Sequence, residues 1–357
     1  MGLANVLRRL ASARSVNDAA QPIEAFDHQY TNIATEEDIF NCFKLLLGRI
    51  PGKKEWHGHR LSAGGDLEAV VKKFINSDEF KGRKLSVKSM SQTAHEIVDL
   101  GDMKICISST DEVCGQLRTA KVYEPGVTSV IQRALKPGMT FVDIGANIGY
   151  FSVMASKIVG DQGRVIGVEP YAYNIKMLQK NISLNGCLNV EVLPFALTDK
   201  KGFLTYDDSA GNSGNVVALG EEFSAILEST LVYCVKLDDV LEQGANVDLI
   251  KMDIEGAEHL ALKGMQKIIN EQVPTIISEV SEGFLRHVSN VSLLEYLTAL
   301  MANERYQIAV IISPENIIPC GRDIEKVIDI YAGVDSMCID VVVYTADKEN
   351  VLFTSQS

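Results

Sequence analysis

The feature that most constrains the fold of this chain is the segment of residues 141–151. A short apolar run there ends in Asp143 and passes into a turn bounded by Gly145 and Gly149. An apolar-periodic segment begins directly after the second glycine. A strand, a tight glycine loop and a helix start, in this order, mark the place where an open α/β sheet binds a nucleotide-like ligand. The two glycines permit close approach of backbone to that ligand.

Two further residues indicate which ligand this is. In a dinucleotide-binding fingerprint the second glycine lets backbone touch a pyrophosphate, and here that position holds Asn147. This position argues against a nicotinamide-dependent dehydrogenase. A second predicted strand ends in Glu169-Pro170, where an acid suits hydrogen bonds to both ribose hydroxyls of an adenosine. The pattern therefore predicts S-adenosylmethionine (SAM), whose methionyl end carries an ammonium and a carboxylate.

Composition narrows the partners and the compartment. The 357 residues carry a net charge of −13, and no long Lys/Arg stripe is present, so nucleic acid is a poor candidate partner. The seven cysteines are scattered and form no C-x-x-C pair. They are therefore expected to be free thiols in a reducing, cytoplasmic location. No apolar run approaches the ~18 residues of a transmembrane helix.

Residues 1–33 are predicted to be a flexible leader. Three arginines, Arg8, Arg9 and Arg14, surround small apolar residues at its start, without the apolar stretch or the cleavage signal of a secretory peptide. A weak peripheral contact with an anionic membrane is one interpretation of this segment, and a frayed chain end is the other.

Residues 34–85 are predicted to form a small helical domain. Thr35 or Asn32 would cap a first helix, and a second helix is expected over residues 65–77. Residues 56–59 between them are expected to form a polar loop. Residues 43–51 and 74–80 resemble a small helical repeat domain found beside glycosyltransferases and related enzymes of bacterial surface-glycan assembly.

Residues 86–357 are predicted to form an α/β domain with a mostly parallel, doubly wound sheet, because strands alternate with helices. A hairpin and short strands are expected over residues 86–122, and two extra strands over residues 201–206 and 231–237. Seven sheet strands are expected: one carrying Asp143, and the others at residues 165–169, 189–193, 247–253, 275–280, 307–312 and 340–344. The last two should pair antiparallel at the sheet edge.

Several motifs in this domain, in the right order, resemble those of FkbM-type SAM-dependent methyltransferases over residues 123–282. The matching segments are Tyr123-Glu124-Pro125 and residues 143–150, 169–170, 184–186, 196–199, 237–239 and 248–258. The resemblance implies a Rossmann-like class I methyltransferase fold and methyl transfer, usually to a hydroxyl of a glycan or natural product. The N-terminal helical domain favours a glycan acceptor.

The resemblance and the loop pattern together select the site residues. Asp253 and Glu255 are the expected catalytic carboxylates, since Asp253 ends the fourth strand and faces the crevice where a hydroxyl proton must be removed. Acids at 255 and 258 could instead stabilise a helix N-terminus. The expected cofactor-binding residues are Glu124, Asp143, Gly145, Ala146, Asn147, Gly149, Glu169, Pro170, Ala196 and Asp253.

Some alternatives stay open at this point. Asp253, Glu255 and Glu279 offer oxygen ligands that would suit Mg²⁺, but nothing in the sequence requires a metal, and no residue is assigned to one. A catalytically silent SAM-binding scaffold and an N-methyltransferase are the competing functions, and the extra strands could pair with a second subunit. Acceptor specificity is expected in the irregular stretches at residues 207–220, 281–290 and 313–335.

Overall fold

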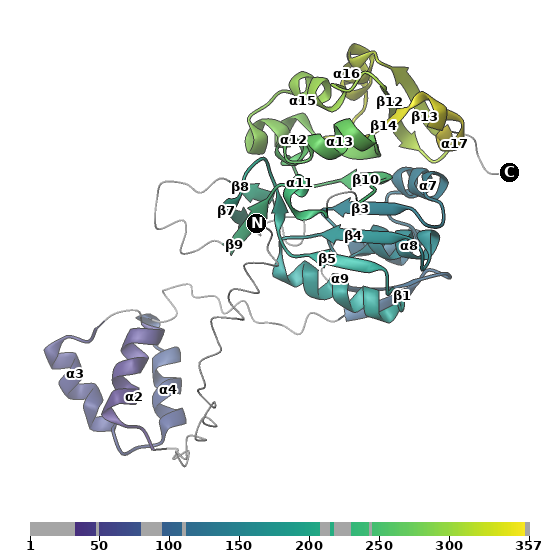
Figure 1. Ribbon diagram of the computed structural model, residues 1–357. Helices are drawn as coiled ribbons and strands as arrows, with labels where there is room; N and C mark the ends of the chain where they lie inside the picture. Colours follow the sequence, from purple (N-terminus) through teal and green to yellow (C-terminus); the bar gives the residue numbers. More distant parts are fainter. Residues whose placement is uncertain are drawn as a thin grey trace, which may run out of the picture. The chain divides into compact units, whose positions relative to one another are not determined.

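The computed structural model in Figure 1 describes residues 33–47, 50–79, 95–108, 112–207, 215–217, 230–242 and 245–353. The chain divides into two compact units, Met1–Gln92 and Thr93–Ser357. The predicted leader, apart from Ile33, and the predicted domain boundary after residue 85 lie outside the described residues. Both therefore stay predictions.

The N-terminal unit is helical. Its elements are α2 (Glu36–Asn41), the π-helix η1 (Cys42–Leu46), α3 (Lys53–His59), the 3-10 helix η2 (Arg60–Ser62) and α4 (Leu67–Ile75). Thr35 caps α2, since its side chain accepts a hydrogen bond from the Asp38 amide at 3.1 Å, and Asp66 caps α4 in the same way.

The polar loop expected at residues 56–59 is wrong, because these residues belong to α3. Gly58 lowers the helix propensity of this stretch, so the sequence alone does not indicate a helix here. The side of the helix that carries His59 packs inward, and the His59 ring lies 5.0 Å from the ring of Phe43 and 5.2 Å from that of Phe74. Tertiary packing therefore stabilises a helix that the local sequence does not predict.

The second unit is built on one eight-stranded sheet. Its strands are β3 (Thr140–Ile144), β4 (Arg164–Val168), β5 (Val190–Leu193), β10 (Leu249–Met252), β11 (Thr275–Val280), β12 (Tyr306–Ser313), β13 (Asn316–Gly321) and β14 (Ile339–Thr345). They lie in the order β13-β12-β14-β11-β10-β3-β4-β5. The five strands from β11 to β5 are parallel, while β14, β12 and β13 pair antiparallel. The Rossmann-like fold is confirmed, with all seven predicted strands present.

The eighth strand, β13, falls in the predicted irregular stretch at residues 313–335, which also contains helix α16 (Ile324–Gly333). Pro319 obscures the strand in the sequence, since proline lacks the amide that a central strand needs. At the sheet edge this cost is small, and β13 pairs with β12 alone. The stretch at residues 281–290 is likewise ordered, as α14 (Glu282–Phe284) and the π-helix η3 (Leu285–Ser289).

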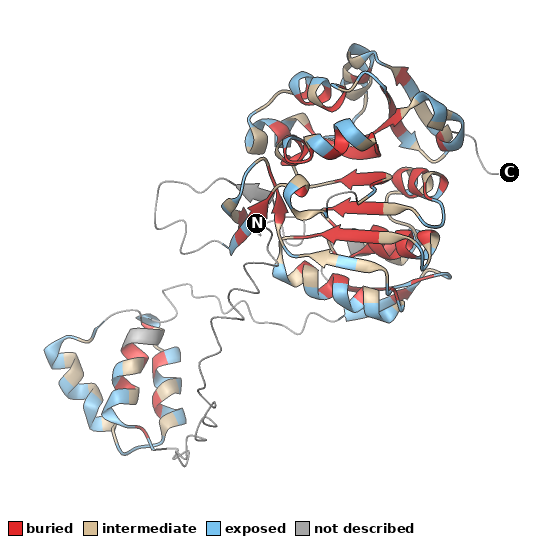
Figure 2. Ribbon diagram, viewed as in Figure 1, coloured by how far each residue is buried: buried red, intermediate tan, exposed pale blue. Residues whose placement is uncertain are grey.

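Helices cover both faces of the sheet (Figure 1). One face packs on α7 (Pro125–Ala134), α8 (Tyr150–Val159) and α9 (Ala172–Leu184), and the other on α12 (Glu258–Lys263), α13 (Gln266–Gln272), α15 (Leu293–Leu300) and α16. Adjacent residues Phe141 and Val142 of β3 face opposite sides, and both are fully buried. Figure 2 shows this double burial along the central strands, as expected for parallel sheets.

The predicted hairpin is present as β1 (His95–Asp99) and β2 (Lys104–Ser108), but residues 112–120 form helix α6 (Glu112–Ala120) where short strands and turns were expected. Asn181 of α9, fully buried, ties the hairpin to the domain. It accepts from the Cys106 amide at 2.7 Å and donates to the Ile148 carbonyl at 2.8 Å. One polar side chain thereby fixes both the hairpin and the glycine loop.

The two predicted extra strands are confirmed within a second, four-stranded sheet. It contains β6 (Ala196–Leu197), β7 (Gly202–Asp207), β8 (Asn215–Val217) and β9 (Thr230–Val235), in the order β6-β9-β7-β8. The short helix α11 (Leu237–Val240) follows it. The chain's described part ends in η4 (Ala346–Lys348) and α17 (Glu349–Phe353).

Across the described residues, no helix is both long enough and apolar enough to span a bilayer. Five of the cysteines in these ranges are buried, Cys338 is half-buried, and all six are free thiols. The expectation of unpaired cysteines is thus met for these six positions.

Replacing Asn181 with leucine should lower the free energy of unfolding by about 2 kcal/mol, because buried backbone groups of Cys106 and Ile148 lose their partner. Urea titration measures this change. Asn185→Leu is the matched control, since Asn185 bonds the backbone of Lys104 on the same hairpin at a more exposed place. An equal loss in both variants would contradict the role assigned to burial.

Candidate active site

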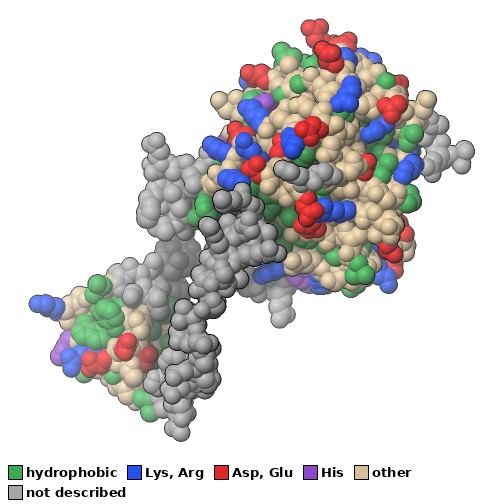
Figure 3. Space-filling view, in the orientation of Figure 1, with side chains coloured by type: hydrophobic (Ala, Val, Ile, Leu, Met, Phe, Trp, Pro, Cys, Tyr) green, Lys and Arg blue, Asp and Glu red, His purple; other side chains and the backbone are tan. Residues whose placement is uncertain are grey.

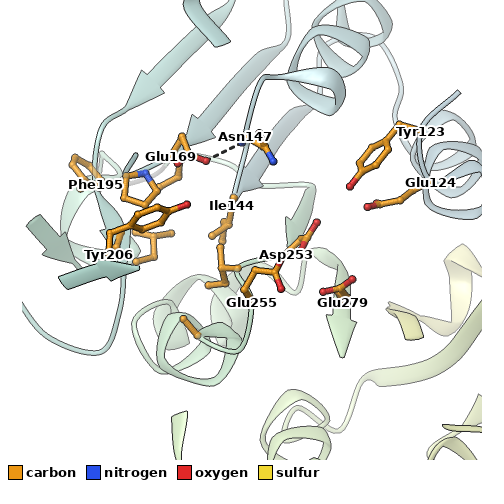
Figure 4. A pocket seen from close by; sticks show the side chains of 17 residues that line it. Tyr123, Glu124, Ile144, Asn147, Glu169, Phe195, Tyr206, Asp253, Glu255 and Glu279 are labelled. Carbon is orange, nitrogen blue, oxygen red and sulfur yellow. Dashed lines mark hydrogen bonds between the residues drawn. The ribbon is translucent and has the colours of Figure 1, made fainter. Parts of the chain in front are cut away.

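A pocket of about 750 Å³ opens at the carboxyl ends of the parallel strands (Figure 4). This is where open α/β sheets bind ligands. The lining residues are Tyr123, Glu124, Ile144, Gly145, Asn147, Val168, Glu169, Pro170, Phe195, Ala196, Leu197, Tyr206, Asp253, Ile254, Glu255, Ala257 and Glu279.

The glycine loop between β3 and α8 is packed tightly against the end of β10. Gly145 has a φ of +82°, and a Cβ at this position would lie 1.9 Å from the carbonyl oxygen of Asp253. Gly149 has a φ of +91°, and its Cβ would lie 2.4 Å from the Leu178 side chain. Asn147 also adopts a left-handed conformation, with φ +49°. Only glycine fits the first two positions, so the loop holds one fixed shape beside Asp253.

Glu169 fastens this loop to the end of β4. Its carboxylate accepts hydrogen bonds from the amides of Asn147 at 2.9 Å and Tyr171 at 2.8 Å. Burial raises the pKa of Glu169 to about 7, although these amides favour the charged form. The carboxylate is therefore held in place at the pocket wall, next to Pro170, before any ligand arrives.

Asp143, Gly149 and Ala146 do not line this pocket. The Asp143 carboxylate lies under the loop, where the Ser152 hydroxyl donates to it at 2.6 Å, and burial raises its pKa against the opposing effect of Lys251. Gly149 precedes the first turn of α8. Ala146 lines a smaller cavity of about 300 Å³ beside the loop. The structure thus gives Asp143 a supporting position beneath the loop.

Aromatic side chains line the pocket near Glu169. Tyr206 of β7 and Phe195 lie at this end in Figure 4. The Tyr206 ring stacks on Tyr171 with centroids 4.9 Å apart and planes 13° from parallel. The predicted residue Ala196 is buried beside them. Sequence analysis missed Tyr206 because the accessory sheet, and not a local motif, brings it to the pocket.

Lys251 is the second residue that sequence analysis missed. Its ammonium, almost fully buried, lies 2.8 Å from Asp253 Oδ2, 4.0 Å from Glu124 Oε2 and 4.7 Å from the centre of the Phe151 ring. Burial lowers the pKa of Lys251, but the neighbouring carboxylates outweigh this and raise it above its usual value. A lysine inside the apolar strand 249–252, two residues before an acid, is the signal that could have found it.

Glu124 approaches the pocket from the loop before α7. Its backbone is left-handed, with φ +42°, which orients the carboxylate towards Lys251 and the Tyr123 phenol. Burial raises the pKa of Glu124, while Lys251 opposes this effect. The predicted residue Glu124 therefore lies with Asp253 around one buried ammonium.

The three acids after β10 occupy different environments. Asp253 and Glu255 line the pocket, and burial, with Asp253 and Glu258 nearby, raises the pKa of Glu255 to about 7. Glu258 does not line it. Its Oε1 atom accepts from the amides of Ile254 at 2.9 Å and Gly256 at 3.2 Å, which stabilises the turn into α12. Glu258 thus stabilises the N-terminus of α12, which was the alternative role considered for the acids at positions 255 and 258.

Glu279, at the end of β11, lines the pocket and joins Glu124, Asp253 and Glu255 in a cluster of acids at the end away from Glu169. Burial, reinforced by Asp253 and Asp340, raises its pKa to about 9. Within the ranges that the structure describes, no three His, Cys, Asp or Glu side chains are arranged to hold a metal ion.

Comparison with known proteins matches residues 143–308 to the methyltransferase FkbM domain. Methyltransferase sdnD of Sordaria araneosa is 29% identical over 171 residues, covering 40% of this chain and 66% of that protein. An arsenite methyltransferase of Halobacterium salinarum is 30% identical over 128 residues, covering 34% of this chain and 32% of that protein. The chain therefore spans less than two thirds of the length of either relative.

Among solved structures, a methyltransferase FkbM from Methylobacillus flagellatus KT is similar at 16% identity and a TM-score of 0.37. The alignment covers 85% of this chain and 58% of that one. Over residues 143–308, the domain match confirms the resemblance to FkbM-type methyltransferases that the sequence motifs predicted.

Replacing Gly145 with alanine should destabilise the domain by about 3 kcal/mol or more, because the new Cβ overlaps the Asp253 carbonyl oxygen. Gly138→Ala is the control: Gly138 has a φ of +85° but no atom within 4 Å of its Cβ position, so it should lose only about 1 kcal/mol. Equal losses in chemical denaturation would show that packing against Asp253 is unimportant.

Raising the pH from 5 to 8 without ligand should lower the melting temperature. The folded chain keeps protons on Glu169, Glu255 and Glu258 up to about pH 7, whereas the unfolded chain releases them near the ordinary glutamate pKa of 4.5. Stability is therefore fully retained below pH 4.5 and lost as pH rises through 7. Calorimetry of wild type and Glu258→Gln checks this, since the variant should show a weaker decline over this window.

Proposed function

We propose that this chain, which carries a methyltransferase FkbM domain over residues 143–308, transfers the methyl group of SAM to a hydroxyl oxygen of a glycan or natural product. The observation that carries the proposal is Glu169, held at the pocket wall by the Asn147 and Tyr171 amides. A fixed carboxylate there can accept hydrogen bonds from both ribose hydroxyls.

The two ends of the pocket fit the two ends of SAM. The adenosine would lie among Glu169, Pro170, Phe195, Ala196 and Tyr206, where one carboxylate meets an apolar, aromatic wall. The methionyl end would lie near Asn147 and Glu124, with Asp143 beneath the loop. Acidic side chains at this end would stabilise the positive charges of the ammonium and the sulfonium.

The protein's chemical task would be orientation and proton removal. When bound, SAM supplies a methyl group that its sulfonium makes electrophilic. The pocket's residues would exclude water and align an acceptor hydroxyl for in-line attack. The hydroxyl proton must then pass to a carboxylate with a pKa close to the working pH. Asp253 and Glu255, the catalytic carboxylates predicted from the sequence, line the pocket wall near this point together with Glu279, so these three acids are the candidates for the base.

Three features bear on the acceptor: the N-terminal helical unit, the surface charge and the sequence after β10. The N-terminal helical unit supports a glycan. On the face shown in Figure 3, lysines and arginines are scattered among acids, which does not favour nucleic acid. After β10 the chain reads Asp253-Ile254-Glu255-Gly256, whereas nitrogen-directed enzymes often present an Asn/Asp-Pro-Pro-Tyr/Phe loop there. We therefore favour methylation of oxygen by a cytoplasmic enzyme over the alternative of an N-methyltransferase.

Isothermal titration with SAM, and separately with NAD, tests the cofactor. Wild type should bind SAM but not NAD, and Glu169→Ala should weaken SAM binding at least about tenfold, or ~1.4 kcal/mol, because the ribose loses its anchor. The control is Glu191→Ala, an exposed acid on β5 that pairs with Arg164.

The results of the SAM titration distinguish the proposed enzyme from its alternatives. Absence of SAM binding in folded wild type would overturn the methyltransferase proposal. Binding without methylation of any hydroxyl or amine acceptor in a broad screen would favour the scaffold alternative.

A further inference from the structure

Glu279 and Asp340 form a pair of adjacent acids that the sequence motifs do not select. They are directly opposite each other on the antiparallel strands β11 and β14. Opposed residues on one face of a sheet have Cβ atoms about 5 Å apart. Glu279 also lines the pocket, and Asp340 stands beside it on the neighbouring strand; both side chains are half-buried.

Glu279 lies at the end of the pocket away from the proposed adenosine site. In Figure 4 it is grouped with Glu124, Asp253 and Glu255, whereas Glu169, Phe195 and Tyr206 lie on the opposite side. With the ribose at Glu169, the sulfonium and the incoming hydroxyl would lie towards Glu279. The pair is therefore placed where the proton of an acceptor has to go.

The surroundings of the pair are acidic. Glu279 faces Asp253 and Glu255 and receives a hydrogen bond from Cys338, and Asp340 faces Glu124, Asp253 and Lys251. Lys251 is already paired with Asp253 at 2.8 Å. Among the residues that the structure describes, no cation forms an ion pair with Glu279 or Asp340. Two like charges so close in a desolvated place favour sharing one proton.

Burial also favours the protonated form. It raises the pKa of Glu279 to about 9, with further contributions from Asp253, Asp340 and Glu255. Burial and Glu124 raise the pKa of Asp340 to about 8, while Lys251 opposes them. Because the two acids interact, the protonation of each carboxyl group depends on the charge of the other. Near pH 8 the ligand-free pair thus retains a proton that an isolated carboxyl group would have lost.

We infer that Glu279, with Asp340 behind it, is the general base of the reaction, and that the pair loses its proton when the positively charged cofactor enters the pocket. This inference rests on the proposed function. A sulfonium at this end of the pocket would stabilise the deprotonated pair by Coulomb attraction. The proton leaves to solvent, and Glu279 becomes a carboxylate facing the acceptor hydroxyl. Asp340 is a positioning residue, since it acts through Glu279.

With Glu279 as a carboxylate, methyl transfer and proton removal take place together. The acceptor oxygen forms a bond to the methyl carbon, the sulfur–methyl bond breaks, and its electron pair stays on sulfur to give neutral S-adenosylhomocysteine (SAH). The hydroxyl proton passes to the Glu279 carboxylate. The pair retains this proton because the product lacks the sulfonium charge that had favoured its loss.

The test compares proton release on binding SAM and SAH, which differ by one methyl group and one positive charge. Isothermal titration near pH 8, in buffers of different ionisation enthalpy, counts the protons released. SAM should release more than SAH, by up to about one proton per site. Glu279→Gln and Asp340→Asn should each abolish most of this excess. Glu304→Gln, at an exposed turn, should leave it unchanged.

The outcomes separate this inference from the proposed function. If folded wild type binds neither SAM nor SAH, the cofactor assignment itself fails. If both bind with equal proton release, or if the excess persists in Glu279→Gln, the pair is not the linked group and the inference is wrong. Should Glu279→Gln fail to fold or to bind, Asp340→Asn decides, because Asp340 does not line the pocket.

Discussion

The arrangement of the pocket depends on the hydrogen bond from the Asn147 amide to Glu169. This bond joins the glycine loop after β3 to the acid after β4, and so fixes two walls of the pocket at once. The loop's other side abuts the Asp253 carbonyl, which admits no side chain at position 145. The glycine loop, Glu169 and the end of β10 therefore form one rigid unit. Positions set by backbone contacts need little reorganisation when a ligand binds.

Around this rigid unit, charge opposes stability. Glu124, Asp253, Glu255 and Glu279 meet at one end of the pocket, and Lys251 is the ammonium buried among them. Desolvated carboxylates repel one another, which lowers the free energy of unfolding above neutral pH. A cationic ligand would reduce that repulsion. The same charges that make the ligand-free protein less stable would thus give selectivity for a positively charged cofactor over a neutral product.

The sequence predicted those parts of the site that local motifs encode. The glycine loop, Glu169-Pro170 and Asp253 follow from strand–turn–helix patterns, and the order of the strands follows from their alternation with helices. Lys251 and Tyr206 could not be predicted this way, because their positions arise from strand register and from the accessory sheet. Glu279 was noted only as a possible oxygen ligand, since its pairing with Asp340 also depends on strand register. Helix α3 and strand β13 were missed for a similar reason: tertiary packing overrides the local signals of Gly58 and Pro319.

The charge of the pocket also bears on the acceptor. Within the described part of the chain, the side chains that line the pocket include five acids, four of them at the end away from Glu169, and no lysine, arginine or histidine. A phosphate or carboxylate beside the reacting hydroxyl would be repelled by these acids, since Lys251, the ammonium buried among them, is already paired with Asp253. A neutral, hydroxyl-rich acceptor avoids this repulsion and can donate hydrogen bonds to the carboxylates. If the proposed methylation takes place in this pocket, an uncharged sugar or polyol portion would fit its charge at the point of methyl transfer.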